Sequence, residues 1–162
     1  MEVFILQNDI HINRLYEIRL LKTQEECEEF DELLEILDNE QNIKLKNLFK
    51  VFDENTDEEG VMFGLVHFVE SFEAEEYLKS LLNFLFDMPI HSVYWIEILV
   101  KRILNSSDYK AKLIDLVGNQ DKKVKLQLAD ILYSIEQDNP ARFSIPVHEF
   151  LKKLYEEIGE KE

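Results

Sequence analysis

Apolar side chains recur at spacings of three and four residues along nearly the whole chain, and this periodicity constrains the fold more than any other feature. Such spacing is typical of an amphipathic α-helix, whereas a half-buried strand alternates at every second residue. Four glycines and three prolines among 162 residues disfavour a turn-rich β architecture. We therefore predict an all-α protein. The first predicted helix carries its apolar side chains at Cys27, Phe30, Leu33, Leu34 and Leu37.

The pattern predicts eight helices separated by short breaks. Breaks of this length favour antiparallel neighbours packed as hairpins. We expect one domain, residues 1–162, in which the hairpins stack like an irregular α-solenoid. Residues 2–6 are equally compatible with an extended chain. The helices are expected near residues 23–38, 43–52, 60–72, 78–85, 96–103, 109–117, 124–135 and 146–158.

Local signals mark several helix ends. Segments 23–26 and 56–59 each place a Thr three residues before a Glu, which is the spacing of a capping box. Ser106 is expected to cap the helix that follows it, and Pro146 to open the last helix. Gly60, Gly64 and Ser71 lie near one line of their helix, so we expect another backbone to approach there.

The formal net charge of −16 is concentrated in one third of the chain. Residues 23–76 hold 18 acidic and 3 basic side chains, whereas the remaining residues hold 16 and 15. A strong negative charge disfavours binding to nucleic acid or to an anionic membrane and favours a cationic partner. A single Cys, with no signal-peptide pattern and no apolar run of about 20 residues, leads us to expect a cytoplasmic protein.

A row of carboxylates follows the side of the first predicted helix that faces away from its apolar residues. Like charges at these spacings cost a helix roughly 0.2–0.5 kcal/mol per pair, so the row opposes folding slightly. We interpret it, with the acidic loop DENTDEEG at residues 53–60, as a partner-binding surface. The alternative is a solvated face that serves solubility. The predicted partner-binding residues are Glu25, Glu28, Glu32, Glu35, Ile36, Asp53, Asp57 and Glu58.

Metal sites find little support in the sequence. Asp53, Asn55 and Asp57 alternate as in a calcium-binding loop, but Glu58 stands where that loop needs Gly and Gly64 where it needs Glu. A solvated acidic loop is the preferred interpretation. His67 and Glu70 share a helix face, yet a bundle metal site requires a second such pair, which is missing. A metal-dependent hydrolase using these two residues remains an alternative; we expect no metal and no cofactor.

Glu70 and Arg102 are expected to belong to one buried polar network, together with His67 and Asn105. A buried carboxylate without a cation or hydrogen-bond donors is costly, and Arg102 supplies both. Such a network fixes helix register and carries out no reaction. Trp95, on the same line of its helix as Arg102, is expected in the core.

Catalysis by a nucleophile is not indicated. Cys27 lies on the apolar side of its helix and has no His near it in sequence, so we expect a buried, inert thiol. The chain has no phosphate-binding loop, no dinucleotide fingerprint and no zinc spacing. We therefore do not expect an enzyme.

Three motifs resemble those of the thirtieth immunity-protein family of bacterial polymorphic toxin systems. They are the leading EE-x-EEF helix, V-M-x-x-L-V-H-x-x-E-x-F at residues 61–72, and W-x-x-x-L-x-x-R-I-L-N at residues 95–105. Together they cover roughly residues 20–110. The resemblance implies an all-helical cytoplasmic protein that binds and neutralises a cognate toxin. The motif residues His67, Glu70, Trp95, Arg102 and Asn105 fit a structural role at least as well as a binding surface.

The resemblance and the charge lead to one hypothesis. A toxin that acts on nucleic acid, such as a nuclease, needs a cationic cleft, and the acidic row and loop would dock on it. Inhibition by occupancy requires no catalytic residue in the inhibitor. The competing hypothesis is a helical adaptor for another cytoplasmic protein, with no toxin involved. The oligomeric state is left open by the sequence.

Overall fold

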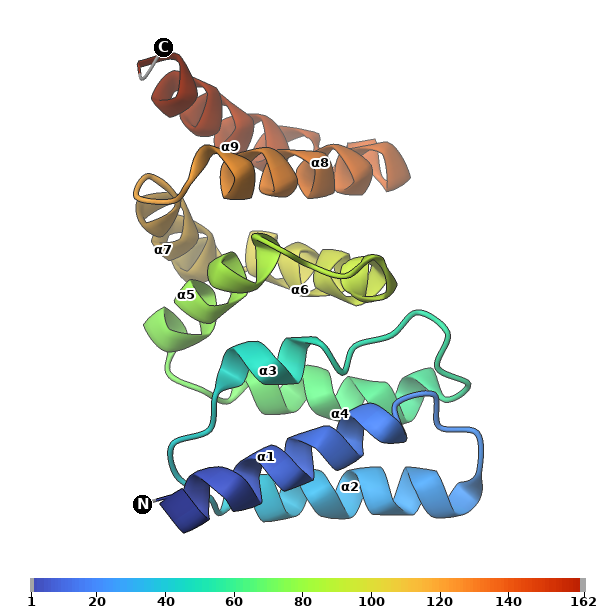
Figure 1. Cartoon of the computed structure of the whole chain (residues 1–162). Coiled ribbons are helices and arrows are strands. Elements are labelled where there is room, and N and C mark those ends of the chain that lie inside the picture. Colours follow the sequence, from blue (N-terminus) through green and yellow to red (C-terminus); the bar gives the residue numbers. More distant parts are fainter. Residues whose placement is uncertain (1, 161–162) are drawn as a thin grey trace. The chain divides into compact units, whose positions relative to one another are not determined.

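The structure, a computed structural model, describes the backbone of residues 2–160 and the side chains of residues 9–156. Within this part the chain is helical and contains no strand (Figure 1), which confirms the all-α prediction. The elements are α1 (Glu2–Glu17), α2 (Gln24–Asp38), α3 (Leu45–Phe49), α4 (Glu59–Glu70), α5 (Ala74–Leu85), the 3-10 helix η1 (Ile90–Ser92), α6 (Val93–Leu104), α7 (Ser107–Val117), α8 (Lys122–Asp138) and α9 (Pro140–Glu160).

The chain forms two compact units, each assembled from two segments. Unit 1 comprises Met1–Glu73 and Met88–Trp95, and unit 2 comprises Ala74–Asp87 and Ile96–Glu162. The expectation of a single domain over residues 1–162 stays a prediction.

In unit 1, α2 packs against both α1 and α4. Helix α1 forms a hairpin with α2, whereas α4 runs in the same direction as α2 because α3 and the loop after it carry the chain back (Figure 1). A Cβ atom placed on Gly64 of α4 would lie 3.5 Å from Leu34 Cδ1. Gly64 therefore faces a side chain rather than the backbone that we expected. A Cβ atom placed on Gly60 would have no neighbour within 4 Å.

Unit 2 is built from α5, most of α6, α7, α8 and α9, with the α8–α9 hairpin as its most extensive helix pair. The hydroxyl groups of Tyr133 and Tyr155 lie 2.8 Å apart across this hairpin. Lys125 of α8 is almost completely buried, and its ammonium group donates a hydrogen bond to the Gly118 carbonyl at 3.3 Å. A buried cation is less costly when an acceptor is within hydrogen-bond distance, as the Gly118 carbonyl is here.

Two helices differ from the prediction. Helix α1 was not among the eight predicted helices; it covers residues 2–6, which we left open to an extended chain, and it buries Ile12 and Leu15 at a spacing of three. Helix α9 begins at Pro140, and Pro146 lies inside it, so the expectation that Pro146 opens the helix is wrong. Pro140 occupies the first turn, where a missing N–H costs nothing.

The predicted cap of α2 is confirmed. Thr23 Oγ1 accepts a hydrogen bond from the Glu26 N–H at 3.1 Å, and the Glu26 carboxylate accepts one from the Lys22 N–H at 2.9 Å. Ser106 caps α7 by accepting from the Tyr109 N–H at 3.3 Å.

The capping box predicted at residues 56–59 is wrong. Helix α4 begins at Glu59 after Glu58, whose side chain makes no capping bond. The Thr56 hydroxyl is buried and has no hydrogen-bond partner among the described residues.

Candidate partner-binding surface

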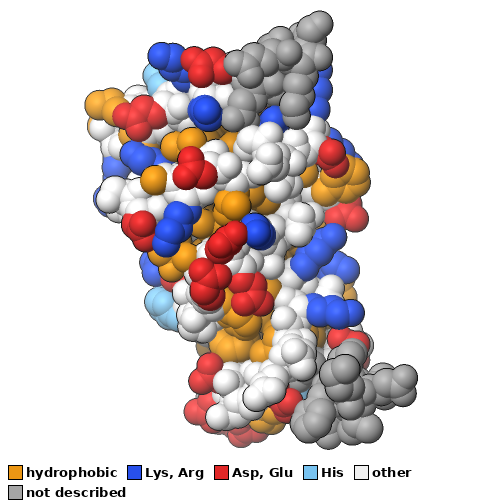
Figure 2. All heavy atoms as spheres, turned by 90° about the vertical axis from the view of Figure 1, so that its left-hand side faces the viewer, with side chains coloured by type: hydrophobic (Ala, Val, Ile, Leu, Met, Phe, Trp, Pro, Cys, Tyr) orange, Lys and Arg blue, Asp and Glu red, His pale blue; other side chains and the backbone are white. Residues whose placement is uncertain are grey.

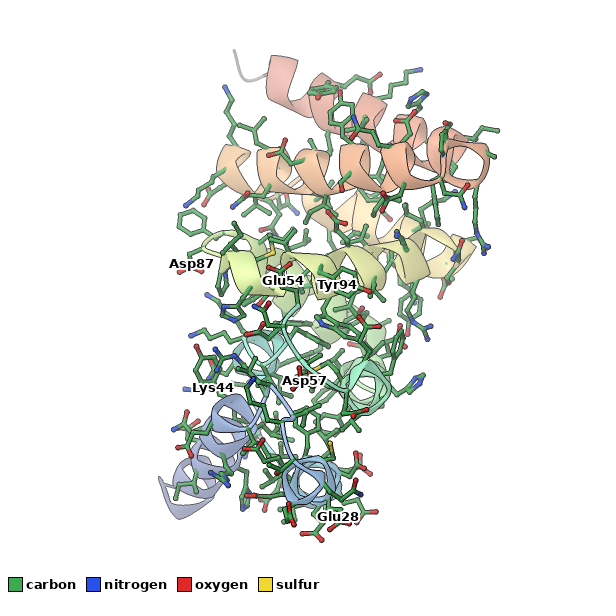
Figure 3. All side chains as sticks on the ribbon, turned by 90° about the vertical axis from the view of Figure 1, so that its right-hand side faces the viewer. Glu28, Lys44, Glu54, Asp57, Asp87 and Tyr94 are labelled. Carbon is green, nitrogen blue, oxygen red and sulfur yellow. The ribbon has the colours of Figure 1, made fainter. Side chains whose placement is uncertain are left out.

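The acidic row of α2, Glu25, Glu28, Glu32 and Glu35, is exposed along its whole length. Phe30, Leu33, Leu34 and Leu37 are buried on the opposite side of the same helix, as the spacing requires. Figure 3 looks toward the N-terminal end of α2 and shows Glu28 pointing away from the rest of the unit. Asp and Glu side chains also gather at the lower end of Figure 2, at the height of α2 in Figure 1.

The two ends of the row differ in their effect on α2. Acids in the first turn, including Glu25, are stabilised by the positive end of the helix dipole. Glu35 lies in the last turn, which carries no basic residue, and there the dipole opposes a negative charge. Helix stability therefore accounts for Glu25 but not for the second half of the row.

The acidic loop continues this negative region beside the first half of α2. Burial, followed by the charges of Glu58, Asp31, Glu26 and Glu28, raises the pKa of the Cys27 thiol. The loop carboxylate of Glu58 is thus close enough to α2 to act on Cys27 together with the helix acids. Cys27 is half-buried rather than fully buried. Its raised pKa is consistent with the inert thiol that we expected.

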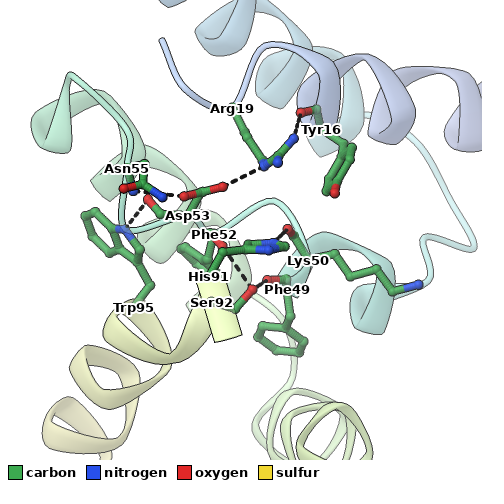
Figure 4. Close-up of polar contacts among 10 residues, drawn as sticks. All are labelled: Tyr16, Arg19, Phe49, Lys50, Phe52, Asp53, Asn55, His91, Ser92 and Trp95. Carbon is green, nitrogen blue, oxygen red and sulfur yellow. Dashed lines mark hydrogen bonds and ion pairs between the residues drawn. The ribbon is translucent and has the colours of Figure 1, made fainter. Parts of the chain in front are cut away.

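Asp53 does not belong to the exposed surface, which corrects the prediction. Its side chain is only 3% exposed and forms an ion pair with Arg19, with 2.8 Å between Arg19 Nε and Asp53 Oδ2 (Figure 4). The Asn55 N–H donates to the other carboxylate oxygen at 2.8 Å. Burial raises the pKa of the Asp53 carboxyl, but the Asn55 N–H and the Arg19 guanidinium outweigh it, so the pKa is lowered overall.

Arg19 is held in turn by the end of α1. Its Nη1 donates to the Tyr16 carbonyl at 2.9 Å, and its guanidinium carbon lies 3.9 Å from the centre of the Tyr16 ring. Sequence reasoning missed Arg19, because no local pattern pairs it with an acid 34 residues further along the chain.

Trp95 lies in the core, as we expected, and contacts the acidic loop. Its side chain is completely buried, and its Nε1 donates to the Asp53 carbonyl at 2.9 Å (Figure 4). The ring stacks on Phe52 at a centroid distance of 5.9 Å and meets the edge of Phe63 at 5.3 Å. Aromatic pairs of this geometry contribute roughly 0.5–1.5 kcal/mol beyond area burial.

Backbone hydrogen bonds fix the rest of the acidic loop. The Glu54 N–H donates to the His91 carbonyl, and the Asp57 N–H donates to the Leu20 carbonyl, both at 2.9 Å. Ser92 Oγ donates to the Phe52 carbonyl at 2.9 Å. We call Asp53, Arg19, Trp95 and these backbone bonds the loop clamp. The loop clamp holds the exposed loop acids in one conformation.

Exposed acidic, aromatic and aliphatic side chains lie on the acidic loop, beside it and beside the acidic row. Asp57 and Glu58 are exposed, as predicted, and so is Glu54. Tyr94 is 42% exposed, and its hydroxyl hydrogen-bonds to the Glu59 carboxylate; burial and this bond raise its pKa. Figure 3 shows Glu54, Asp57 and Tyr94 on the same face of unit 1 as Glu28. Ile36, the apolar residue that we expected beside the row, is also 42% exposed.

The prediction that four of the family-motif residues form a buried polar network is wrong. His67, Arg102 and Asn105 are exposed, and Glu70 is half-buried. Asn105 Oδ1 accepts a hydrogen bond from Arg142 Nε at 3.2 Å. Helical spacing places residues on a common line but does not show whether that line is covered. A structural role for these residues stays a prediction.

No group of three or more His, Cys, Asp or Glu side chains in the described part of the chain is arranged to hold a metal ion. Among the described helices, none is both long enough and apolar enough to cross a membrane.

Taken together, the fold and the surface define a helical protein whose first unit presents carboxylates on a clamped loop and on an adjoining helix. The chain matches the family model described as immunity protein 30 over residues 17–113, which is more than half of its length. It therefore belongs to the immunity protein 30 family, as the three motifs indicated, and this membership implies an immunity protein with a cognate toxin as its partner. No curated protein and no solved structure matches the chain.

The match places the candidate surface within the family region. Residues 17–113 include α2, the acidic loop and Trp95, whereas α8 and α9 lie beyond them. Immunity proteins generally act without catalysis, which agrees with the expectation from the sequence.

Proposed function

We propose that this protein neutralises its toxin by occupancy, with the acidic row and the acidic loop docked on a cationic surface of the toxin domain. The single observation that carries the proposal is the exposed negative charge of Glu32 and Glu35, which helix stability does not explain. The helix dipole disfavours an anion in the last turn, so α2 carries Glu35 at a small cost in stability.

The loop clamp supports the same proposal. Binding costs less when the interacting groups are already ordered, because fewer side chains and backbone dihedrals are immobilised on association. Asp57 and Glu58 are exposed on a loop that an ion pair and backbone hydrogen bonds hold in place. Tyr94 and Ile36 supply apolar contact area at the margins of the charge, as tight interfaces require.

Charge complementarity acts mainly on the association rate. A negative surface facing a cationic cleft steers the encounter and raises the rate above the roughly 10⁵–10⁶ M⁻¹s⁻¹ of neutral partners. A toxin that cleaves nucleic acid has such a cleft, so a nuclease domain is the partner class that we propose. Fast capture suits an inhibitor that must act before the toxin does.

The first prediction concerns the acidic row. Glu28→Lys, Glu32→Lys and Glu35→Lys combined should slow association with the cognate toxin domain by about tenfold or more at low salt. The salt dependence of the association rate should shrink, because the steering charge has been reversed. Stopped-flow kinetics at several NaCl concentrations measures both quantities.

A matched control separates local charge from net charge. Asp115→Lys, Asp130→Lys and Glu156→Lys change the net charge equally but lie on exposed positions of unit 2. This control should associate at close to the wild-type rate. If both triple variants slow association equally, only net charge matters and the proposed surface is wrong.

A further inference from the structure

Unit 1 contains a groove between α1 and α3 that the proposed function does not use. It encloses about 580 Å³, within the range of ligand-binding pockets. Helix α1 forms one wall, α3 and the residue after it form the other, and the segment before α6 closes one end. The lining residues are Asp9, Ile12, Asn13, Tyr16, Asn47, Lys50, Pro89 and His91.

The walls of the groove suit an extended peptide. Asn13 on one wall and Asn47 on the other each offer an amide N–H donor and a carbonyl acceptor, the same groups that a peptide backbone presents. Ile12 and Pro89 supply the apolar part of the lining. Asp9 and Tyr16 are seven residues apart on α1, a rise of about 10 Å, which matches roughly three residues of extended chain.

The charge of the groove is unequal along its length. Lys50 and His91 line the end near Tyr16, and Asp9 lines the other end. Lys44, Lys46 and Lys50 are exposed, and none of the three forms an ion pair with a described residue. Unit 1 therefore presents a basic edge at α3, in contrast to the carboxylates of α2. An acidic side chain placed beside Lys50 complements this edge.

A hydrogen bond and a ring contact connect the residues at the end of the groove near Lys50. His91 Nε2 is hydrogen-bonded to the Lys50 carbonyl at 3.1 Å, and the rings of His91 and Tyr16 have a centroid distance of 6.3 Å (Figure 4). The carbonyl groups of His91 and Tyr16 also accept bonds from Glu54 and Arg19 of the loop clamp. The groove and the acidic loop are thus held by one set of contacts, so a partner meets both in a fixed relation.

We propose that the α1–α3 groove binds an extended segment of about three residues from the toxin, with an acidic side chain of that segment beside Lys50. This inference rests on the proposed function, because its ligand is part of the toxin. The acidic row and loop govern the rate of capture, and the groove governs the rate of release. A complex formed by charge alone dissociates readily at physiological salt, so a buried contact of this kind is what retains the toxin.

The test compares two lysines of the basic edge. Lys50→Glu should raise the dissociation rate of the toxin domain by about tenfold, since it places a negative charge beside the bound carboxylate. Lys46→Glu makes the same change of charge four residues earlier, at a position that does not line the groove, and should change the rate less than about twofold. Surface plasmon resonance measures both rates, and thermal unfolding checks that each variant is folded.

A second pair tests the amide wall without altering charge. Asn13→Ala should speed dissociation by about threefold or more, because its two hydrogen bonds to the peptide are lost. Ile10→Ala, on the same helix and exposed but not lining the groove, should leave the rate unchanged.

The acidic side chain of the toxin is then located by double-mutant cycles. Each Asp or Glu of the toxin domain is replaced by Ala and combined with Lys50→Ala; one replacement should be non-additive with it. The groove proposal is overturned if Lys50→Glu and Lys46→Glu release the toxin at the same rate, or if no toxin carboxylate couples to Lys50. Failure of the wild-type chain to bind the toxin domain would instead overturn the proposed function.

Discussion

At the scale of single residues, two acids four positions apart in the acidic loop have opposite roles. Asp53 is buried against Arg19 and accepts hydrogen bonds from its own loop, whereas Asp57 is exposed and makes no ion pair with a described residue. The first holds the loop, and the second belongs to the proposed partner-binding surface. The sequence DENTDEEG shows both as identical carboxylates, so only burial separates them.

Asp53→Asn should lower the free energy of unfolding at pH 7 by about 2–3 kcal/mol, because it breaks an ion pair that is largely removed from water. Asp57→Asn is the matched control and should change stability by less than about 0.5 kcal/mol, while it slows association with the toxin. Urea unfolding measures the first effect and stopped-flow kinetics the second. Equal losses of stability in the two variants would contradict the assignment of the loop clamp.

The pH dependence of stability identifies the same carboxylate. The folded-state pKa of Asp53 is lowered, so the unfolded chain binds a proton at this position more readily than the folded chain. Its contribution to stability is fully present above its unfolded-state pKa of about 4 and is lost as the pH falls through the lower folded-state pKa. Below pH 4, the stability of Asp53→Asn should therefore fall less steeply than that of the wild type.

At the scale of elements, α2 has a buried apolar side and an exposed acidic row. The helix dipole stabilises the acid at the start of this row and destabilises the acid at its end. Glu35→Lys should raise the free energy of unfolding by about 0.5 kcal/mol, since a cation in the last turn is favourable. Glu25→Lys should lower it by a similar amount, since the first turn favours an anion.

Both single reversals should slow association with the toxin by about two- to threefold, because both remove charge from the same surface. Equilibrium unfolding and association kinetics on this pair therefore separate stability from binding. If both variants changed the free energy of unfolding in the same direction, the helix dipole would not explain the effect of these charges on stability.

The sequence predicted the elements well where apolar residues repeat over three or more turns. Helix α2, with its Thr23 cap, follows directly from its pattern. Helix α3 is shorter than predicted, five residues, because the chain turns at Lys50 to bring Phe52 and Asp53 onto Trp95. That turn depends on contacts distant in sequence, and local periodicity does not report them.

The candidate site was only partly predictable for the same reason. Exposure of the acidic row follows from the helix pattern. Burial of Asp53 required Arg19, which lies 34 residues earlier. The exposure of His67 and Arg102 also depends on packing, because helical spacing places residues on a common face but does not show whether that face is covered.

At the scale of the whole molecule, the charge is divided unequally between the two units. Unit 1 contains 19 acidic and 6 basic residues, and unit 2 contains 15 and 12. Self-repulsion of like charge destabilises a compact state, so unit 1 bears most of this cost. We interpret this loss of stability as the consequence of the proposed negative docking surface, which concentrates charge on unit 1 while unit 2 stays close to neutral.

Salt should therefore stabilise the two units unequally. Raising NaCl from about 10 mM to about 0.3 M shortens the screening length from roughly 30 Å to below 8 Å, which weakens repulsion within unit 1. Protection of α2 and α4 amides against hydrogen exchange should rise more than protection of α8 amides, measured by mass spectrometry on the native protein. The triple variant Glu28→Lys, Glu32→Lys and Glu35→Lys removes much of the repulsion, so its α2 amides should gain less from salt. An equal gain in α2 and α8 of the wild type would show that the unequal distribution of charge has no effect on folding.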